Sequence, residues 1–360
     1  MREQFFMGGV TPEGFSTELR EYVNGSEYFT FILKGGPGTG KSTLMKKIAD
    51  RFGDAEDVTL YYCSADPGSL DAVELHSSKT LIVDGTSPHV FEAMFPGVSQ
   101  KVINLGAHWD ENSLREHGDE IISVTRLNKS LLSGAAYYNN ALGIICNSTY
   151  EFANRILNRQ MIEDEVEDLC EKLFAHRGKS IGKQDIRQLS VITMNGYMTL
   201  TDTLENYSDI FVLNDSFFAA SDVFIDIVAK KALEYGCHVK LSPCLLFGQL
   251  VREHLLIKDT GVALVTSNPL TQLKEQRGTQ KDLSVFYDKE QVRLYDEIFK
   301  SNESIMKKIE ETSRGTLAKA KHIHDELEKY YTNAMDLETL DRVYNGICEE
   351  ISLRSESNKK

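Results

Sequence analysis

The sequence predicts an α/β fold made of two tandem cores, each with a mainly parallel sheet and flanking helices, and each followed by a helical arm. Two observations predict this class. Short apolar and β-branched runs alternate with an amphipathic helical pattern in the first third of the chain. The same order of elements returns about 180 residues later, which indicates an internal duplication. The expected domains are a first core over 1–110, a helical arm over 111–185, a degenerate second core over 186–287 and a C-terminal helical arm over 288–360.

The first core opens with a strand, a glycine-rich loop and a helix. The run "YFTFIL" at 28–33 is apolar, aromatic and β-branched, which is typical of a buried strand. A helix is predicted from Lys41, because Leu44 and Ile48 are spaced to share one face.

The loop between them has the GxxxxGK[ST] pattern of a phosphate cradle, and the cores are therefore predicted to be of the P-loop type. Its glycines allow backbone angles closed to other residues, and the helix N-terminus adds unpaired N–H donors and the positive end of a dipole. Lys41 is expected to contact the β- and γ-phosphates of ATP or another NTP, and Ser42 to hold Mg²⁺. The predicted nucleotide-binding residues are Gly35, Gly36, Pro37, Gly38, Thr39, Gly40, Lys41, Ser42 and Thr43.

A second strand, "TLIVD", is predicted to end at Asp84. P-loop proteins place at this position the acid that orients Mg²⁺ and its waters, so Asp84 is predicted to act with Ser42 as a metal residue and with Lys41 in catalysis. The alternative is an Asp that only forms a turn. Gly85 follows, whereas motor-type ATPases usually carry a catalytic Glu there. This favours a kinase-like or slow, switch-like enzyme.

Asp66, in "YYCSADPGSLDAV" at 61–73, is predicted at the same edge, because ligands of open α/β sheets gather at the carboxyl ends of strands. The roles of Asp66 stay open: it is predicted to be catalytic, as a general base or by binding an acceptor hydroxyl, and the alternative is a turn cap before Pro67. His89 is a further candidate, although a lone loop histidine is more often a bystander. The sequence does not choose among four candidate arginine fingers, Arg115, Arg126, Arg187 and Arg252.

The second core keeps the elements but not the chemistry of the loop. The stretch "NDSFFAASD" at 214–222 has no glycine, and its two Asp carboxylates would repel a triphosphate. One nucleotide per chain is therefore expected. In the self-alignment Lys41 falls on Ser221, Ser42 on Asp222, Asp84 on Val265, and Trp109 on Phe286 or Tyr287.

Composition narrows the classes of partner. The chain has 40 basic and 54 acidic residues, and its net charge of −14 argues against nucleic acid as the main partner. No apolar run approaches the ~20 residues needed to span a bilayer, and the N-terminus lacks the apolar region of a secretory signal. Six cysteines without CxxC spacing indicate neither a zinc site nor a disulfide framework. We therefore expect a cytoplasmic protein without a membrane partner.

The helical arms carry apolar residues at helical intervals among many charges, as in "SIMKKIEETSRGTLAKAKHIHDELEKYY" at 304–331. This pattern is typical of a solvated helix in a hairpin or bundle. Packing between the two halves is the expected role of the arms, with a surface for a protein partner as the alternative.

Together, the segments "GGVTPEGF", "GGPGTGKSTLMKKIA", "CSADPGSLDAV" and "IVDGTSPH" resemble a group of bacterial tandem P-loop proteins described as nucleotide-kinase-like ATPases. The resemblance spans nearly the whole chain, and the last two segments are its more particular signatures. It implies ATP binding and, by name only, phosphoryl transfer, with no defined substrate. The second half can carry its own phosphate loop in that group, and this chain departs from the group there.

Two classes of function follow. The first is an enzyme that uses Mg·ATP for hydrolysis or for transfer to a small-molecule acceptor. The second is a nucleotide-gated binding or scaffold protein, in which ATP locks the two halves together and turnover is incidental. A base beside the γ-phosphate would separate the two classes, and Asp66 is the candidate for that base.

Overall fold

The computed structural model describes the chain except residues 12–13, 26, 88–89, 249, 274–277 and 358–360. The described chain divides into two compact units. The fold is α/β, as predicted, because each unit contains one six-stranded, mostly parallel sheet with helices against it. Unit 1 comprises Met1–Gly9, Phe15–Ala135 and Gly315–Lys360, and unit 2 comprises Val10–Gly14 and Ala136–Arg314.

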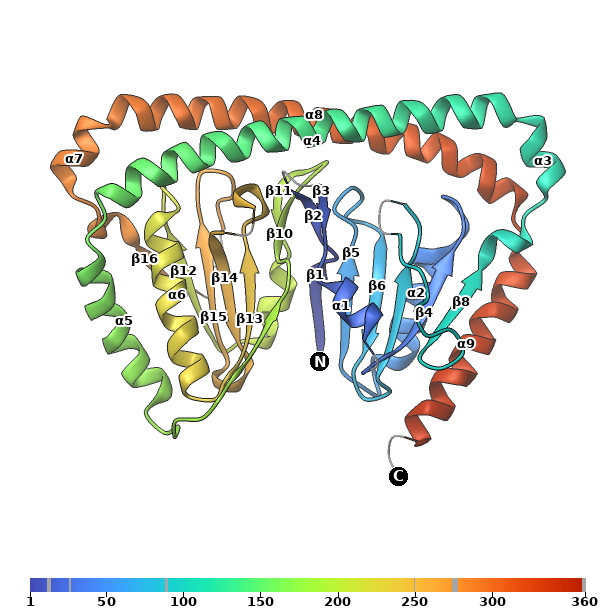
Figure 1. Ribbon diagram of the computed structural model, residues 1–360, viewed down its shortest axis with the longest axis horizontal. Helices are drawn as coiled ribbons and strands as arrows, with labels where there is room; N and C mark the ends of the chain where they lie inside the picture. Colours follow the sequence, from blue (N-terminus) through green and yellow to red (C-terminus); the bar gives the residue numbers. More distant parts are fainter. Residues whose placement is uncertain (12–13, 26, 88–89, 249, 274–277, 358–360) are drawn as a thin grey trace. The chain divides into compact units, whose positions relative to one another are not determined.

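The sheet of unit 1 contains β1 (Arg2–Phe6), β4 (Phe29–Lys34), β5 (Val58–Tyr62), β6 (Leu70–Leu75), β7 (Thr80–Asp84) and β8 (Gln100–Asn104). Their order across the sheet is β1-β5-β6-β7-β4-β8 (Figure 1). β6 is antiparallel to both of its neighbours, and the other pairs are parallel. The first residues of β6 therefore lie at the same edge as the last residues of β5 and β7.

Helix α2 (Lys41–Phe52) packs against this sheet with its apolar face. Leu44, Met45 and Ile48 on that face are each at most 5% exposed and join one cluster with residues of β4, β5, β6 and β7. Burying each of these side chains stabilises the fold by about 1.5–3 kcal/mol. Helix α9 (Leu337–Ser357) adds Ile347 and Ile351 to the same cluster.

The sheet of unit 2 has the same topology. It contains β9 (Lys183–Ile186), β12 (Asp209–Asn214), β13 (His238–Pro243), β14 (Arg252–Ile257), β15 (Val262–Ser267) and β16 (Thr279–Asp282). Their order is β9-β13-β14-β15-β12-β16, with β14 antiparallel to both of its neighbours, so the strands match those of unit 1 one by one. Helix α6 (Ala219–Glu234) takes the place of α2, and the predicted repeat is confirmed as a repeat of the fold.

The strand register corrects one detail of the self-alignment. Leu33 of β4 pairs with Asp84 of β7, and its counterpart Leu213 of β12 pairs with Thr266 of β15. Asp84 therefore corresponds to Thr266, and the expected match to Val265 was wrong by one position. The offset between the repeats grows from 180 at Leu33 and Leu213 to 182 at Asp84 and Thr266. The sequence did not reveal this shift, because β7 and β15 are almost wholly buried and so show no alternation that would fix the register.

The remaining elements are short strands, turns and the arms. The small strands are β2 (Gly9–Thr11) with β3 (Gly14–Ser16), and β10 (Ser190–Thr193) with β11 (Gly196–Thr199). The short helices are α1 (Leu19–Asn24), α3 (Glu111–Glu116) and α7 (Lys289–Leu294). Single 3₁₀ turns are η1 (Leu105–His108), η2 (Thr201–Asn206), η3 (Leu245–Phe247), η4 (Lys258–Thr260) and η5 (Leu283–Phe286).

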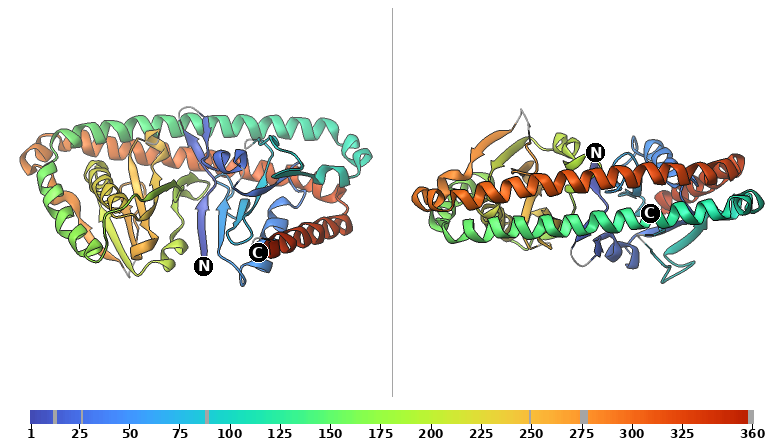
Figure 2. Two further views of the ribbon diagram at one scale, coloured as in Figure 1. Left: turned by 60° about the horizontal axis from the view of Figure 1, so that its bottom comes forward. Right: turned by 90° about the horizontal axis from the view of Figure 1, so that it is seen from above.

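Each arm contains one long helix that runs through the division between the units. Helix α4 (Gly118–Arg155) belongs to unit 1 up to Ala135, and helix α8 (Asp296–Ala334) belongs to unit 1 from Gly315 onward. Within unit 1 these two segments lie side by side (Figure 2), and Asn128 Nδ2 of α4 donates a hydrogen bond to Ala320 O of α8 at 2.7 Å.

The arms are therefore exchanged between the two repeats. The end of α8 and the whole of α9, which follow the second core in the sequence, belong to unit 1. Helix α5 (Arg159–Phe174), which follows the first core, belongs to unit 2, where Ile162, Val166 and Phe174 pack in one cluster with α6. None of the helices among the described residues has the length and apolar composition required to cross a bilayer.

Candidate nucleotide-binding site

The predicted phosphate loop lies in unit 1, between the end of β4 at Lys34 and the start of α2 at Lys41. Gly35, Gly38 and Gly40 have φ angles of +154°, +69° and +81°, a region that favours glycine. The glycine-rich sequence predicted such angles, and these three positions confirm it.

Lys41 is the first residue of α2 and only 8% exposed. Its Nζ donates hydrogen bonds to Gly35 O at 2.9 Å and Gly36 O at 2.8 Å, and lies 3.6 Å from Asp84 Oδ2. The ammonium is thus held against the carbonyls of its own loop. Because an ionised oxygen is a stronger partner for an ammonium than a neutral carbonyl, a phosphate oxygen can replace these contacts.

Ser42 and Asp84 supply the oxygen atoms expected of a magnesium site. Ser42 Oγ accepts a hydrogen bond from Leu70 N at 2.9 Å. Asp84 Oδ1 accepts from Thr86 N at 2.9 Å and Thr86 Oγ1 at 2.6 Å, and its Oδ2 faces Lys41. Hydroxyl and carboxylate oxygens are hard ligands of the kind that Mg²⁺ prefers, so the donor set fits this metal. The turn-forming contacts of Asp84 Oδ1 are compatible with that role, since Oδ2 is not part of the turn.

Asp66 lies in the turn between β5 and β6. Its Oδ1 accepts from Gly68 N at 3.1 Å, its Oδ2 accepts from Ser69 Oγ at 2.8 Å, and Lys321 Nζ of α8 lies 3.4 Å from Oδ2. The hydrogen bonds with Gly68 and Ser69 are those expected of a turn cap, and the ion pair with Lys321 is an additional contact. The catalytic role of Asp66 stays a prediction.

Asp71 is an acidic residue at this edge that the sequence interpretation missed. It stands second in β6 and is 6% exposed, and because β6 is antiparallel, its first residues lie at the edge where β7 ends at Asp84. Burial, with the charge of Asp71 nearby, raises the pKa of the Cys63 thiol well above its ordinary value. Cys63 is therefore kept protonated and unsuited to nucleophilic attack.

Helix α8 packs directly on the predicted phosphate loop, and Leu340 of α9 would lie 3.3 Å from a Cβ on Gly40. Thr332 Oγ1 of α8 donates a hydrogen bond to Gly38 O at 3.2 Å. A Cβ on Gly36 would lie 3.1 Å from Tyr331 Cε1, and a Cβ on Gly38 would lie 2.6 Å from Glu328 O. Glycine at 38 is thus required by the closeness of α8, and a Cβ at 36 would make the Tyr331 ring shift, which the sequence did not indicate.

Trp109 also lies between the loop and the end of α8. Its ring lies 5.3 Å from that of Tyr331, and its backbone pairs with Met335 at the end of α8. In unit 2 Tyr287 pairs with Leu157 in the same way, which confirms Tyr287 as the counterpart of Trp109. Trp109 therefore packs against residues from the far end of the sequence.

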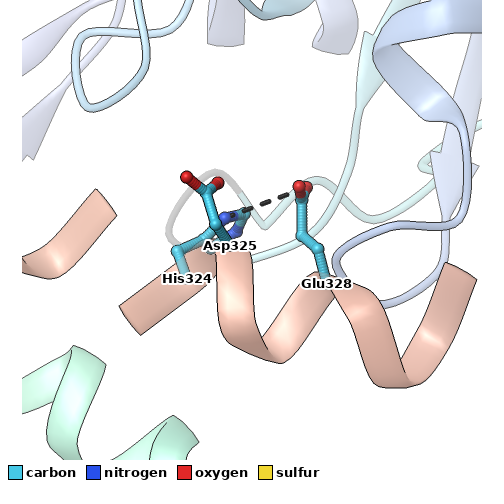
Figure 3. A group of neighbouring side chains, drawn as sticks. All are labelled: His324, Asp325 and Glu328. Carbon is cyan, nitrogen blue, oxygen red and sulfur yellow. Dashed lines mark ion pairs between the residues drawn. The ribbon is translucent and has the colours of Figure 1, made fainter. Parts of the chain in front are cut away.

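A further polar group lies on the same part of α8. Among the described residues, one set of side chains comes close enough to hold a metal ion: His324, Asp325 and Glu328, with ligand atoms within 4.8 Å of one another (Figure 3). His324 Nδ1 lies 3.8 Å from Glu328 Oε1, and Lys321 Nζ donates a hydrogen bond to Asp325. Because this ammonium lies beside the carboxylate, we assign no cation to the group.

The other predicted residues are distributed as follows. Thr39 is fully buried, and its Oγ1 donates to Gly36 O at 2.9 Å, so it braces the loop, while Thr43 is exposed on α2. His89 lies outside the described residues.

The four candidate arginines are divided between the two units. In unit 1, Arg115 pairs with Glu111, and Arg126 lies in the same unit. In unit 2, Arg187 lies near Asp185 and Arg252 is paired with Asp222.

In unit 2 the corresponding loop is occupied by its own side chains. Asp215 Oδ1 accepts from Phe217 N at 2.9 Å and Tyr287 Oη at 2.9 Å, and Oδ2 accepts from Ser221 N at 2.8 Å. Ala220 N donates to Tyr287 Oη at 2.8 Å. A carboxylate and a phenol thus take the N–H groups that a phosphate would need, and burial raises the pKa of Asp215.

The two loops remain related in backbone shape. Phe218 has a φ of +69°, the same value as Gly38 in unit 1, although phenylalanine rarely adopts it. Asp222 Oδ1 accepts from Arg252 N at 2.9 Å, as Ser42 Oγ accepts from Leu70 N. The second copy therefore retains features of the unit 1 loop, with the N–H groups of Phe217, Ala220 and Ser221 already bonded to its own side chains.

Comparison of the chain with protein-family models, with curated proteins and with solved structures finds no match.

Proposed function

We propose that unit 1 binds a nucleoside triphosphate with Mg²⁺ and turns it over slowly, as an ATPase or a nucleotide-kinase-like phosphotransferase. The observation that supports this most is the loop before α2. Three glycines at positive φ lead into a helix whose first residue, Lys41, contacts the loop carbonyls and lies near Asp84. Backbone N–H groups at a helix N-terminus, together with a cation, form a site for phosphate oxygens.

In this proposal the residues have separate tasks. Lys41 leaves the loop carbonyls and neutralises the β- and γ-phosphates, while Ser42 and Asp84 hold Mg²⁺ directly or through water. When bound, the metal would offset negative charge of the triphosphate and polarise its phosphoryl oxygens. The backbone N–H groups of residues 36–42 orient the phosphates, and the turnover step needs an acceptor hydroxyl or a water beside the γ-phosphate.

The proposal is tested by phosphate release from Mg·ATP in the intact chain. Lys41→Ala should reduce turnover by at least ~10²-fold, because it removes the cation that stabilises transferred charge. Lys46→Ala is the matched control, since Lys46 lies on the same helix and donates to Gly68 O from an exposed position. Equal turnover in the wild type and the Lys41 variant would contradict the proposal.

A second candidate is a nucleotide-gated binding protein, favoured by the contacts of α8 on the loop. A nucleotide that moves Gly36 or Gly38 would change the packing of Tyr331 and Thr332, and with it the helical surface offered to a protein partner. Amide hydrogen exchange of residues 315–334, with and without a non-hydrolysable ATP analogue, tests this idea. Altered exchange in a protein that releases no phosphate would favour gating, and unaltered exchange would exclude it.

A further inference from the structure

Unit 2 contains a cavity at the place where unit 1 has its phosphate loop. Its volume is about 890 Å³, within the ~300–1,000 Å³ typical of small-molecule sites. The floor is formed by the carboxyl ends of β12, β15 and β16, at Asn214, Ser267 and Asp282, and one wall by α7 and the start of α8. The fold thus keeps an open site where its loop has lost the phosphate donors.

Another part of the cavity lining is apolar and aromatic. The rings of Phe217 and Phe299 are stacked, with centroids 4.3 Å apart and an interplanar angle of 29°. Met306 also lines the cavity and is 1% exposed. A flat ring and a thioether favour an apolar planar group as the buried part of a ligand.

Much of the charge around the cavity is internally neutralised. On α8, Lys300 pairs with Asp296 at 2.7 Å and Lys307 pairs with Glu303 at 2.6 Å. Asp215 is engaged in its own loop, as described above. Asp282 also lines the cavity, and its carboxylate accepts a hydrogen bond from Ser284 N at 2.9 Å, so it is engaged in its own turn in the same way as Asp215.

Two cations on α7 are different. Lys289 and Arg293 line the cavity four residues apart on one helix face, and neither has an ion-pair or hydrogen-bond partner among the described residues. Like charges at this spacing repel each other, so the pair is unfavourable without an anion nearby.

Unit 1 shows the contrast at the equivalent helix. Asp110 and Asp288 are both N-caps, of α3 and α7 respectively, which aligns Glu111 with Lys289 and Arg115 with Arg293. Glu111 and Arg115 form an ion pair. The second copy thus replaces a neutral pair with two cations, in a chain whose net charge is −14.

We propose that this cavity binds a small organic anion that has a planar apolar ring and one carboxylate or phosphate group. The ring packs against Phe217, with Phe299 and Met306 behind it, and the anionic group is held by the exposed side chains of Lys289 and Arg293. The triphosphate arrangement of unit 1 is excluded here, because the N–H groups of the loop are bonded to Asp215 and Tyr287. The proposal is independent of the function proposed for unit 1.

The test uses 8-anilinonaphthalene-1-sulfonate, a fluorescent aromatic anion, with the full chain. Wild-type protein should bind it, and Lys289→Gln/Arg293→Gln should weaken binding by at least ~10-fold, because two charge-assisted contacts are lost. Arg115→Gln, at the equivalent place in unit 1, is the matched control and should bind as the wild type does. Equal affinity in the double variant and the control would overturn the proposal.

Two further measurements locate the probe and identify its head group. In protein with ¹³C-methyl methionine, binding of the probe should shift the NMR signal of Met306, which is assigned by its loss in Met306→Leu. Shifts confined to other methionines would overturn the site.

Indole-3-acetate, which has a carboxylate, and adenosine 5′-monophosphate, which has a phosphate, are then used as competitors. Displacement by either, but not by neutral indole or adenosine, supports an anion site and identifies its preference. Equal displacement by the neutral compounds would overturn it.

Discussion

Replacing Gly38 by Ala tests whether α8 packs on the phosphate loop. Two effects add at this position. The φ of +69° is unfavourable for any residue with a Cβ, at about 1–2 kcal/mol. The new Cβ would also lie 2.6 Å from Glu328 O and 2.7 Å from Thr332 Oγ1, so the loop and the helix would have to separate.

The cost of the clash with α8 can be worked out from the contacts that are lost when the loop and the helix move apart. The Thr332–Gly38 hydrogen bond contributes about 0.5–1.5 kcal/mol, and the packing of Tyr331 against Gly36 is disturbed with it. We expect these two effects together to lower the free energy of unfolding of Gly38→Ala by about 1.5–3.5 kcal/mol. Gly97→Ala is the matched control, because Gly97 has a φ of +78° and no neighbour within 4 Å of a new Cβ. It should lose only the ~1–2 kcal/mol due to φ.

Urea unfolding followed by tryptophan fluorescence measures both variants. The chain has one tryptophan, Trp109, and it contacts Tyr331 at this junction, so the signal reports on unit 1. The difference between the two variants gives the contribution of the contact with α8. If the free energies of unfolding of Gly38→Ala and Gly97→Ala differ by less than ~0.5 kcal/mol at equal m-values, the loop does not pack against α8, which would refute the reasoning.

Two further predictions concern single carboxyl groups. Asp66→Asn should leave Mg·ATP affinity nearly unchanged and lower turnover by ~10²–10⁴-fold, as the loss of a general base would. Unchanged turnover, with ~1 kcal/mol lost in stability, would instead leave Asp66 as the turn cap that its contacts with Gly68 and Ser69 describe. In unit 2, burial raises the pKa of Glu253 to about 7 and lowers that of His254 to about 3. Protonated Glu253 stabilises the fold at low pH, and this contribution is lost as pH rises from ~4.5 to ~7. Neutral His254 stabilises the fold at higher pH, and this contribution is lost as pH falls below ~6.5. In the wild type the two residues therefore change the free energy of unfolding in opposite directions with pH. In urea unfolding, the free energy of unfolding of Glu253→Gln minus that of the wild type should therefore rise by about 3 kcal/mol from pH 4.5 to pH 7.5. A difference that is independent of pH would contradict this.

The sequence predicted the parts of the site that depend on local chemistry. The glycines before Lys41 and the helix after it are specified within a dozen residues, and Asp84 ends its own strand. The duplication was visible because each half repeats the same hydrophobic pattern.

Other parts depend on contacts far apart in the chain. Tyr331 and Thr332 lie almost 300 residues from the glycines they contact, on a helix whose charges resemble those of any solvated helix. The antiparallel direction of β6, which brings Asp71 to the site, cannot be deduced from alternation, because a buried strand has the same composition in either direction. The cavity of unit 2 was missed because the loss of the glycines suggested only the loss of a site.

A titration of the intact chain with Mg·ATP by isothermal calorimetry tests the central claim, that unit 1 is the nucleotide site, most directly. The account predicts one equivalent bound per chain in the wild type and in Lys46→Ala, and an affinity ~10-fold or more weaker in Lys41→Ala, since a charge-assisted contact of about 1.5–3 kcal/mol is removed. Two equivalents, or unchanged affinity in Lys41→Ala, would contradict it.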